Sequence, residues 1–121
     1  IVGIGDNSSK KSFYSAEKRE EWVKNTFENY DNILVKKYSG LTINFAEKEN
    51  AEFIFRGLRS SLDYEYEKQI AETNSVLNKE IETIFLLSDK KYGMISSSIV
   101  RDILKNNGDI RDFVPKEVKI S

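Results

Sequence analysis

The fold of this chain is indicated most clearly by Phe53-Ile-Phe-Arg-Gly-Leu-Arg59, which Ser60-Ser-Leu-Asp-Tyr-Glu-Tyr-Glu67 follows directly. A short apolar run ends in Arg-Gly-x-Arg and passes into a segment with helical spacing and several carboxylates. In α/β proteins such a junction forms an anion site at the carboxyl end of a parallel strand. We therefore predict a strand over 51–55, a helix over about 61–77, and an anion site at Arg56–Arg59.

The same alternation of apolar runs and helix-like segments covers the whole chain. Further strands are predicted over 1–4, 33–35 and 83–87, and further helices over 15–30, 41–49 and from Ser96 or Ser97 to a stop at Asn106-Asn-Gly108. Pro115 is expected to open a last helix. Continuously apolar strands that alternate with helices are typical of a parallel sheet. We predict an α/β fold, a parallel sheet flanked by helices on both faces, in a single domain over residues 1–121.

Composition narrows the class of protein. The chain has 121 residues, of which 39% are hydrophobic and 32% charged, as expected for a globular domain with one modest core. The net charge of −1 gives no basic field that would attract nucleic acid. No apolar run is long enough to span a bilayer and no signal peptide is recognisable. We expect a cytoplasmic protein with neither a nucleic-acid nor a membrane partner.

The chain contains no cysteine and no histidine. Disulfides, thiolate zinc sites, cysteine nucleophiles and Ser-His-Asp triads are therefore excluded for this sequence. Lysine, arginine, carboxylates, hydroxyls and backbone N–H groups remain to do any chemistry. These groups suit phosphate handling, in which positioning and charge neutralisation do most of the work.

Four junctions follow the carboxyl ends of the predicted strands, and each is polar or basic. They are Asp6–Lys11, Ser39–Thr42, Arg56–Arg59 and Tyr92–Ser98. The carboxyl ends of parallel strands meet at one edge of a sheet, so these junctions are candidates for a common ligand site. Three of them have a plainer interpretation: a solvated loop at Lys10 and Lys11, a helix start at Thr42, and an N-cap at Ser96–Ser98.

The Arg56–Arg59 junction is the strongest of the four. Two arginines at a buried strand end are costly unless an anion, or a carboxylate such as Asp63 or Glu67, pairs with them. Asp63 and Glu67 share one helix face at i, i+4. The alternatives at this junction are therefore a ligand phosphate and an ion pair within the chain. A carboxylate on that face could also accept hydrogen bonds from a ribose.

Several motifs, in this order along the chain, resemble a known enzyme family. They are Ser8-Ser-Lys-Lys11, Arg56-Gly-Leu-Arg59 with Asp63-Tyr-Glu-Tyr-Glu67, Ile95-Ser-Ser-Ser98, and Gly108-Asp109 followed by Phe113-Val-Pro115. As a set, over essentially the whole chain, they resemble bacterial phosphopantetheine adenylyltransferase. The resemblance implies a Rossmann-like nucleotidyltransferase fold. It also implies an enzyme of coenzyme A biosynthesis that joins ATP and 4′-phosphopantetheine to give dephospho-coenzyme A and pyrophosphate.

The resemblance also implies roles for individual residues. Lys10, Thr42 and Arg56 match positions that bind phosphopantetheine, and Lys10 and Arg56 would stabilise charge. The ATP-binding positions matched are Gly57, Leu58, Arg59, Glu67, Tyr92, Gly93, Met94, Ile95, Ser96, Ser97 and Ser98. No residue is assigned as a metal ligand, although Mg²⁺ is expected with ATP. Coenzyme A is a further expected ligand, and a homohexamer the expected assembly.

One part of the family pattern has no counterpart here. The family's first strand carries a Gly-Thr-Phe-Asp segment, and its first helix opens with a Thr/His-x-Gly-His motif whose histidine stabilises the transition state. We expect this sequence to lack that N-terminal segment, and the 121 residues alone to bind poorly and to catalyse negligibly. Two alternatives remain: a nucleotidyltransferase with another phosphorylated acceptor, such as nicotinamide mononucleotide or glycerol phosphate, and a non-catalytic nucleotide-binding or assembly module.

Overall fold

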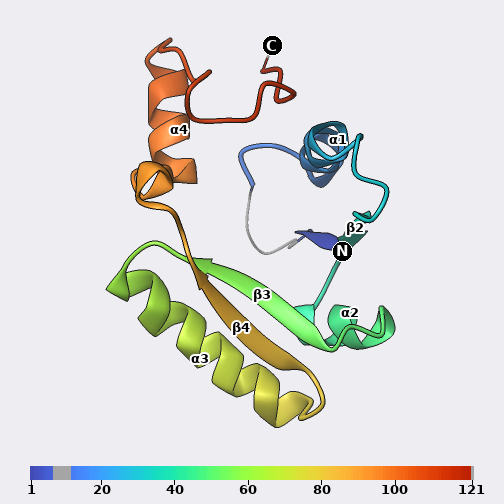
Figure 1. Cartoon of the computed structure of the whole chain (residues 1–121). Helices are drawn as coiled ribbons and strands as arrows, with labels where there is room; N and C mark the ends of the chain where they lie inside the picture. Colours follow the sequence, from blue (N-terminus) through green and yellow to red (C-terminus); the bar gives the residue numbers. More distant parts are fainter. Residues whose placement is uncertain (7–11, 121) are drawn as a thin grey trace. The chain divides into compact units, whose positions relative to one another are not determined.

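A computed structural model describes residues 1–6 and 12–120, and these divide into two compact units. The first unit comprises Ile1–Gly40 with Ser96–Ser121, and the second comprises Leu41–Ile95 (Figure 1). Each unit contains one two-stranded parallel sheet. The α/β class with parallel strands is thus confirmed, whereas the single domain over residues 1–121 stays a prediction.

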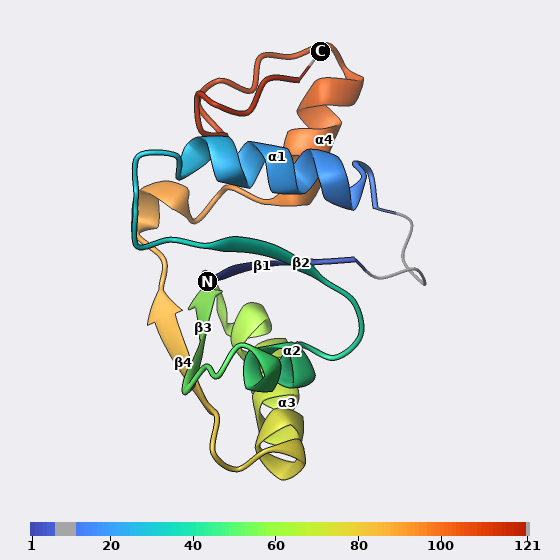
Figure 2. The same ribbon diagram turned by 90° about the vertical axis from the view of Figure 1, so that its right-hand side faces the viewer.

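The sheet of the first unit consists of β1 (Val2–Gly5) and β2 (Val35–Tyr38), with Val2 opposite Val35. Helix α1 (Ala16–Thr26) contacts both strands and lies along them in Figure 2. The predicted N-cap is confirmed, because the Ser15 hydroxyl accepts the Lys18 N–H at 3.2 Å. The strand predicted over 33–35 is wrong in its bounds. Backbone pairing with β1 holds the chain extended through two lysines whose side chains give no strand signal.

Helix α4 (Ser97–Lys105) of the first unit starts and stops where the sequence predicted. Ser96 is its N-cap, and the C-terminus closes with Asn107 at φ 57° and a 2.8 Å bond from the Gly108 N–H to the Ile103 carbonyl. A Cβ on Gly108 would lie 2.6 Å from Ile103 Cγ2, so any larger residue would require Ile103 to shift. The helix predicted to begin at Pro115 does not form. A single turn closes there instead, with Val118 N–H donating to the Pro115 carbonyl, because one turn does not offset the cost of nucleating a helix.

The second unit pairs β3 (Phe53–Leu58) with β4 (Glu82–Leu87), with Phe53 opposite Glu82. The same unit contains α2 (Thr42–Lys48), α3 (Ser61–Leu77) and the short 3₁₀ helix η1 (Lys90–Tyr92). Its small core lies where α2 meets the strand starts, and consists of Ile43, Ala46 and Ile81 with Ala51 and Ile54 packed against them. Helix α3 contacts β3, alongside which it runs in Figure 1.

Strand β3 is longer than the sequence predicted. It continues through Arg56, Gly57 and Leu58, because pairing with β4 extends as far as Leu58 opposite Leu87. Arg56 therefore projects from within a strand rather than from the loop after it. Side chains alternate along a strand, so Arg56 lies on the same face as Ile54. Both line a pocket beneath α3.

The face that α3 turns toward the strands differs from the apolar face predicted for it. Hydrophobic spacing within residues 61–77 predicts that Leu62, Tyr66, Ile70 and Leu77 face inward, yet Leu62, Tyr66 and Leu77 are 80%, 60% and 55% exposed, and of the four only Ile70 lines the pocket. The residues facing β3 and β4 are polar, small or branched: Glu67, Ile70, Ala71 and Asn74. Hydrophobic periodicity misplaced the buried face because this helix covers an arginine as well as apolar side chains. None of the helices within residues 1–6 and 12–120 has the length and apolar character needed to cross a membrane.

Candidate active site

Arg56 and Glu67 form a bidentate ion pair between β3 and α3. Arg56 Nε donates to Glu67 Oε2 at 2.8 Å, and Nη2 donates to Oε1 at 2.6 Å. The Glu67 side chain is 12% exposed and that of Arg56 48%. The carboxylate is thus held under the helix while the guanidinium reaches solvent. The pairing within the chain that the sequence left open is formed here, and it joins two residues expected to contact different substrates.

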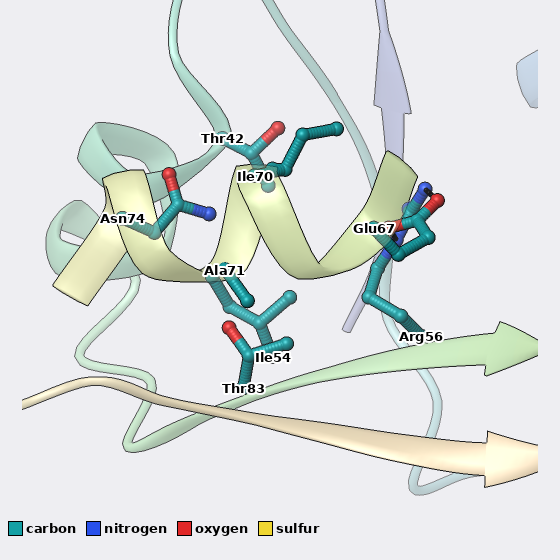
Figure 3. A pocket seen from close by; sticks show the side chains of 8 residues that line it. All are labelled: Thr42, Ile54, Arg56, Glu67, Ile70, Ala71, Asn74 and Thr83. Atoms are coloured by element: carbon teal, nitrogen blue, oxygen red, sulfur yellow. Dashed lines mark hydrogen bonds and ion pairs between the residues drawn. The ribbon is translucent and has the colours of Figure 1, made fainter. Parts of the chain in front are cut away.

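A pocket of about 80 Å³ extends from this ion pair along the underside of α3. Figure 3 shows Arg56 and Glu67 at one end and Asn74 at the other. Between them lie Ile54 of β3, Thr83 of β4, Thr42 of α2, and Ile70 and Ala71 of α3. Asn74 follows Glu67 by seven positions in α3, which corresponds to a rise of about 10 Å along the helix axis. The pocket therefore has an ion pair at one end, an apolar middle and an amide at its far end.

Among the described residues, Thr42 is the only predicted phosphopantetheine position besides Arg56 that lines this pocket. It is the first residue of α2, whose N-cap Leu41 makes no side-chain capping bond. Gly40 precedes it with φ +83°, a left-handed conformation that favours glycine. The turn from β2 into α2 is therefore what brings Thr42 to the pocket.

Arg59 is held by Asp63 and does not line the pocket. Asp63 Oδ2 accepts from the Arg59 backbone N–H at 2.9 Å and from Nε at 3.0 Å, and Oδ1 accepts from Nη2 at 3.2 Å. Arg59 Nη1 donates to the Ile95 carbonyl at 2.6 Å. The hydrogen bonds from Arg59 lower the pKa of Asp63, and the hydrogen bond to Asp63 raises the pKa of Arg59. Asp63 is therefore a carboxylate, and Arg59 a cation, at any physiological pH.

Gly57 and Leu58 separate the two arginines and differ in what they offer a ligand. Leu58 as a whole residue is 7% exposed, so it offers little surface to a bound molecule. The nearest atom to a Cβ built on Gly57 is Ser88 Oγ, at the ordinary contact distance of 3.7 Å. Space inside the protein therefore does not require glycine at position 57. A ligand that approaches the backbone would.

The segment Tyr92–Ile95, the first part of the predicted Tyr92–Ser98 junction, forms a compact turn. Asp89 caps η1 by accepting the Lys91 N–H at 3.0 Å, and the Ile95 N–H donates to the Tyr92 carbonyl at 2.9 Å. Tyr92 and Met94 are 53% and 65% exposed. Two large side chains are thus presented to solvent at the place predicted to contact adenine.

The serines at Ser96–Ser98 form the N-terminus of α4, as their plainer interpretation predicted. Ser96 Oγ accepts the Ile99 N–H at 3.2 Å, and Ser98 Oγ accepts from Arg101 Nη2 at 3.2 Å. A helix N-terminus has unpaired N–H groups that suit a phosphate. Capping by Ser96 and phosphate binding at the same helix N-terminus are therefore compatible.

Lys10, the remaining predicted phosphopantetheine and charge-stabilising residue, lies outside the described residues. For metals, residues 1–6 and 12–120 contain no group of three or more carboxylates or histidines that could hold an ion.

Sequence analysis missed the far half of the pocket. Ile70, Ala71, Asn74 and Thr83 were not singled out as site residues, yet they line it. One signal was available, because Asn74 lies at i+7 from Glu67 and therefore on the same helix face. No comparable signal existed for Thr83, which reaches the pocket only because it pairs opposite Ile54.

Comparison with known proteins shows which family this chain resembles in sequence. Residues 1–103 match the model of the cytidylyltransferase-like family. The phosphopantetheine adenylyltransferase of Flavobacterium psychrophilum is 48% identical over 120 residues, which cover 99% of this chain and 79% of that protein. The enzymes of the same name from Flavobacterium johnsoniae and Prochlorococcus marinus subsp. pastoris are 45% and 44% identical, with 78% and 75% of their lengths covered.

The chain belongs to the phosphopantetheine adenylyltransferase family. Membership confirms the resemblance that the motifs indicated. It also confirms the prediction that the protein is an enzyme of the nucleotidyltransferase type. It also confirms the Rossmann-like fold class, which is that of the cytidylyltransferase-like family. The roles of individual residues in this phosphopantetheine adenylyltransferase family member stay predictions.

Proposed function

We propose that the protein transfers the adenylyl group of ATP to 4′-phosphopantetheine, giving dephospho-coenzyme A and pyrophosphate. The observation that carries this proposal is identity of 44–48% with relatives of that name over nearly the whole chain. The pocket beside Arg56 supports it, because a half-exposed guanidinium followed by apolar lining suits an acceptor with a phosphate and a long neutral arm.

In this proposal, the acceptor lies along α3. Its phosphate meets Arg56, whose guanidinium suits the bidentate recognition of phosphate oxygens. Its arm follows Ile70 and Ala71, and the Asn74 amide offers a donor and an acceptor to the amide groups of pantetheine. Thr42 borders the same pocket. Lys10 would add a second cation to the acceptor phosphate.

The ATP phosphates are assigned to Gly57–Arg59 and to the N-terminus of α4. A phosphate oxygen of the acceptor attacks the α-phosphorus of ATP, a new P–O bond forms, and the bond to the β-phosphate oxygen breaks to release pyrophosphate. No covalent enzyme intermediate is needed. Arg56 and Arg59 would act by holding two polyanions in contact and by neutralising charge on the phosphoryl oxygens.

Magnesium is part of the proposal as a companion of ATP. Mg²⁺ keeps several water ligands and often binds through substrate phosphates with few protein carboxylates. Asp63 and Glu67, the carboxylates nearest to the two arginines, are already committed to ion pairs. The residues of this site therefore fit an ion that arrives with the triphosphate, where it would neutralise charge on the leaving pyrophosphate. A homohexameric assembly and a cytoplasmic location complete the proposal.

The test is an assay of pyrophosphate release by the full-length protein. ATP, Mg²⁺ and 4′-phosphopantetheine are expected to give pyrophosphate and dephospho-coenzyme A in equal amounts. Nicotinamide mononucleotide and glycerol phosphate, offered separately in place of phosphopantetheine, are expected to give none.

Each other outcome selects a different function. Turnover with one of the alternative acceptors and none with phosphopantetheine would assign the protein to another nucleotidyl transfer. ATP binding measured by calorimetry without turnover of any acceptor would favour a non-catalytic nucleotide-binding module.

A further inference from the structure

Asp63 gathers more hydrogen bonds from Arg59 than a helix cap requires. Ser60 already caps α3 by accepting the Asp63 N–H at 3.2 Å. The Asp63 carboxylate then accepts the Arg59 backbone N–H and two guanidinium N–H groups, at 2.9–3.2 Å. The side chains of Asp63 and Arg59 are 24% and 37% exposed, so the pair is only partly solvated. Main chain and side chain of one arginine are thus fixed by one carboxylate.

The Arg59 guanidinium still has N–H groups available for a ligand after these bonds form. A guanidinium carries five N–H groups in a planar fork. Nε and Nη2 each give one to Asp63, and Nη1 gives one to the Ile95 carbonyl. One N–H on Nη1 and one on Nη2 remain, with no hydrogen-bond partner among the described residues. Since the plane is fixed at two edges, these donors point in a defined direction.

The Ile95 contact connects two distant parts of the second unit. Ile95 is 36 residues from Arg59 in sequence and ends the turn that begins at Tyr92. It also immediately precedes Ser96 in the chain, the N-cap of α4. A 2.6 Å bond from a cation to this carbonyl fixes the turn against the β3–α3 junction. Whatever orients Arg59 therefore also orients the Tyr92–Ile95 turn.

We propose that Asp63 is a positioning residue for ATP binding, which acts by holding the Arg59 guanidinium against the Ile95 carbonyl so that its two remaining N–H groups face the nucleotide phosphates. This inference rests on the proposed function, which assigns the ATP phosphates to Arg59. Asp63 itself does not touch ATP, because a carboxylate repels a triphosphate. The negative charge of Asp63 makes the site less positive, which by itself weakens the attraction of ATP. In return, Asp63 fixes the Arg59 guanidinium, so its N–H donors need no rearrangement when ATP binds.

The test uses Asp63→Asn in the full-length protein. Asparagine keeps a side-chain oxygen for the Arg59 backbone N–H but removes the charge and sets an NH₂ group against the guanidinium. We expect the Kd for ATP, measured by calorimetry, and the KM for ATP to rise about tenfold, the loss of roughly one charge-assisted hydrogen bond. The KM for phosphopantetheine is expected to stay within about twofold, because Arg56 and its pocket make no use of Asp63.

A double-mutant cycle separates positioning from capping. In an Arg59→Ala background, Asp63→Asn is expected to change the Kd for ATP by less than about twofold, since the residue through which it acts is gone. Asp63→Glu, which restores the charge, is expected to recover part of the lost affinity. Asp109→Asn is the matched control, because it breaks an exposed pair with Arg111 in the other unit and is expected to leave the Kd unchanged.

The outcomes distinguish this inference from the function beneath it. A wild-type protein that neither binds ATP nor turns it over overturns both. A wild-type protein that does so, with equal effects of Asp63→Asn in both backgrounds or none in either, overturns the inference alone. If Asp63→Asn does not fold, Asp63→Ser takes its place, because serine is accepted in a first helical turn and also lacks the charge.

Discussion

Arg56 and Arg59 are three residues apart in one motif, yet the structure gives them different partners and surroundings. Arg56 pairs with Glu67 and borders a pocket with an apolar interior. Arg59 pairs with Asp63 and reaches the carbonyl of Ile95. Asp63 and Glu67 are successive positions on one face of α3, so a single helix face holds both cations. The two arginines are therefore expected to serve different ligands.

This difference predicts that two alanine substitutions weaken the binding of different substrates. Arg56→Ala is expected to raise the KM for phosphopantetheine, and Arg59→Ala the Kd for ATP, each by about 10- to 100-fold, the loss of charge-assisted hydrogen bonds. Steady-state kinetics with each substrate varied in turn, together with calorimetry, measure both. Arg111→Ala is the matched control, since Arg111 is paired with an aspartate but lies outside the site. Unchanged ATP affinity in Arg59→Ala would contradict its assigned role.

At the scale of elements, an ion pair joins α1 to β2 in addition to the packing of the buried face of α1. Lys37 Nζ on β2 lies 2.9 Å from Glu17 Oε1, in the first turn of α1, and 3.7 Å from Glu20 Oε2. Ala16 and Trp22 supply the buried side of the helix. The hydrogen bond from Lys37 is the largest cause that lowers the pKa of Glu17 to about 2. This ion pair links α1 to β2 and is lost when the Glu17 carboxylate is protonated at low pH.

The pKa of Glu17 predicts how this link depends on pH. A carboxyl whose pKa falls on folding, here from 4.5 to about 2, stabilises the folded state fully above pH 4.5. That contribution is lost as the pH falls through the folded-state value. Lys37→Met is therefore expected to lower the free energy of unfolding at pH 7 and to have a progressively smaller effect below pH 4.5. Urea unfolding of both proteins at several pH values measures the difference, and one that does not vary with pH would contradict the prediction.

At the scale of the whole molecule, the chain consists of two compact units, each with its own parallel strand pair. The candidate acceptor pocket and both arginine pairs lie within the second unit, Leu41–Ile95. The serines assigned to ATP belong to the first. The residues predicted to bind ATP are thus distributed over the residue ranges of both units.

The homohexamer is the prediction that belongs to this scale. The full-length protein is expected to sediment at six times its chain mass at micromolar concentration. Large exposed side chains such as Leu62 and Val76, each 80% exposed, are of the kind that subunit interfaces cover. Sedimentation equilibrium over a concentration series measures the assembly. A monomer across the whole series would overturn the prediction and leave the enzymatic proposal standing.

The sequence by itself determined the features that depend on neighbours a few residues away. It located Ser15 and Ser96 at helix starts, Asn107 and Gly108 at a helix end, and the Arg56–Arg59 junction between strand and helix. Capping bonds join groups three to five residues apart, so the residue types that make them can be recognised in a linear pattern.

Only the tertiary structure decided which distant groups meet. Arg56 finds Glu67 across 11 residues and Arg59 finds Ile95 across 36, and neither choice is encoded in a local pattern. The same holds for the extension of β3 through Arg56, the entry of Thr83 and Asn74 into the pocket, and the exposure of Leu62. These features follow from the register of β3 on β4 and from the way α3 lies on them, and both are set by packing and pairing over the whole unit rather than by neighbours in sequence.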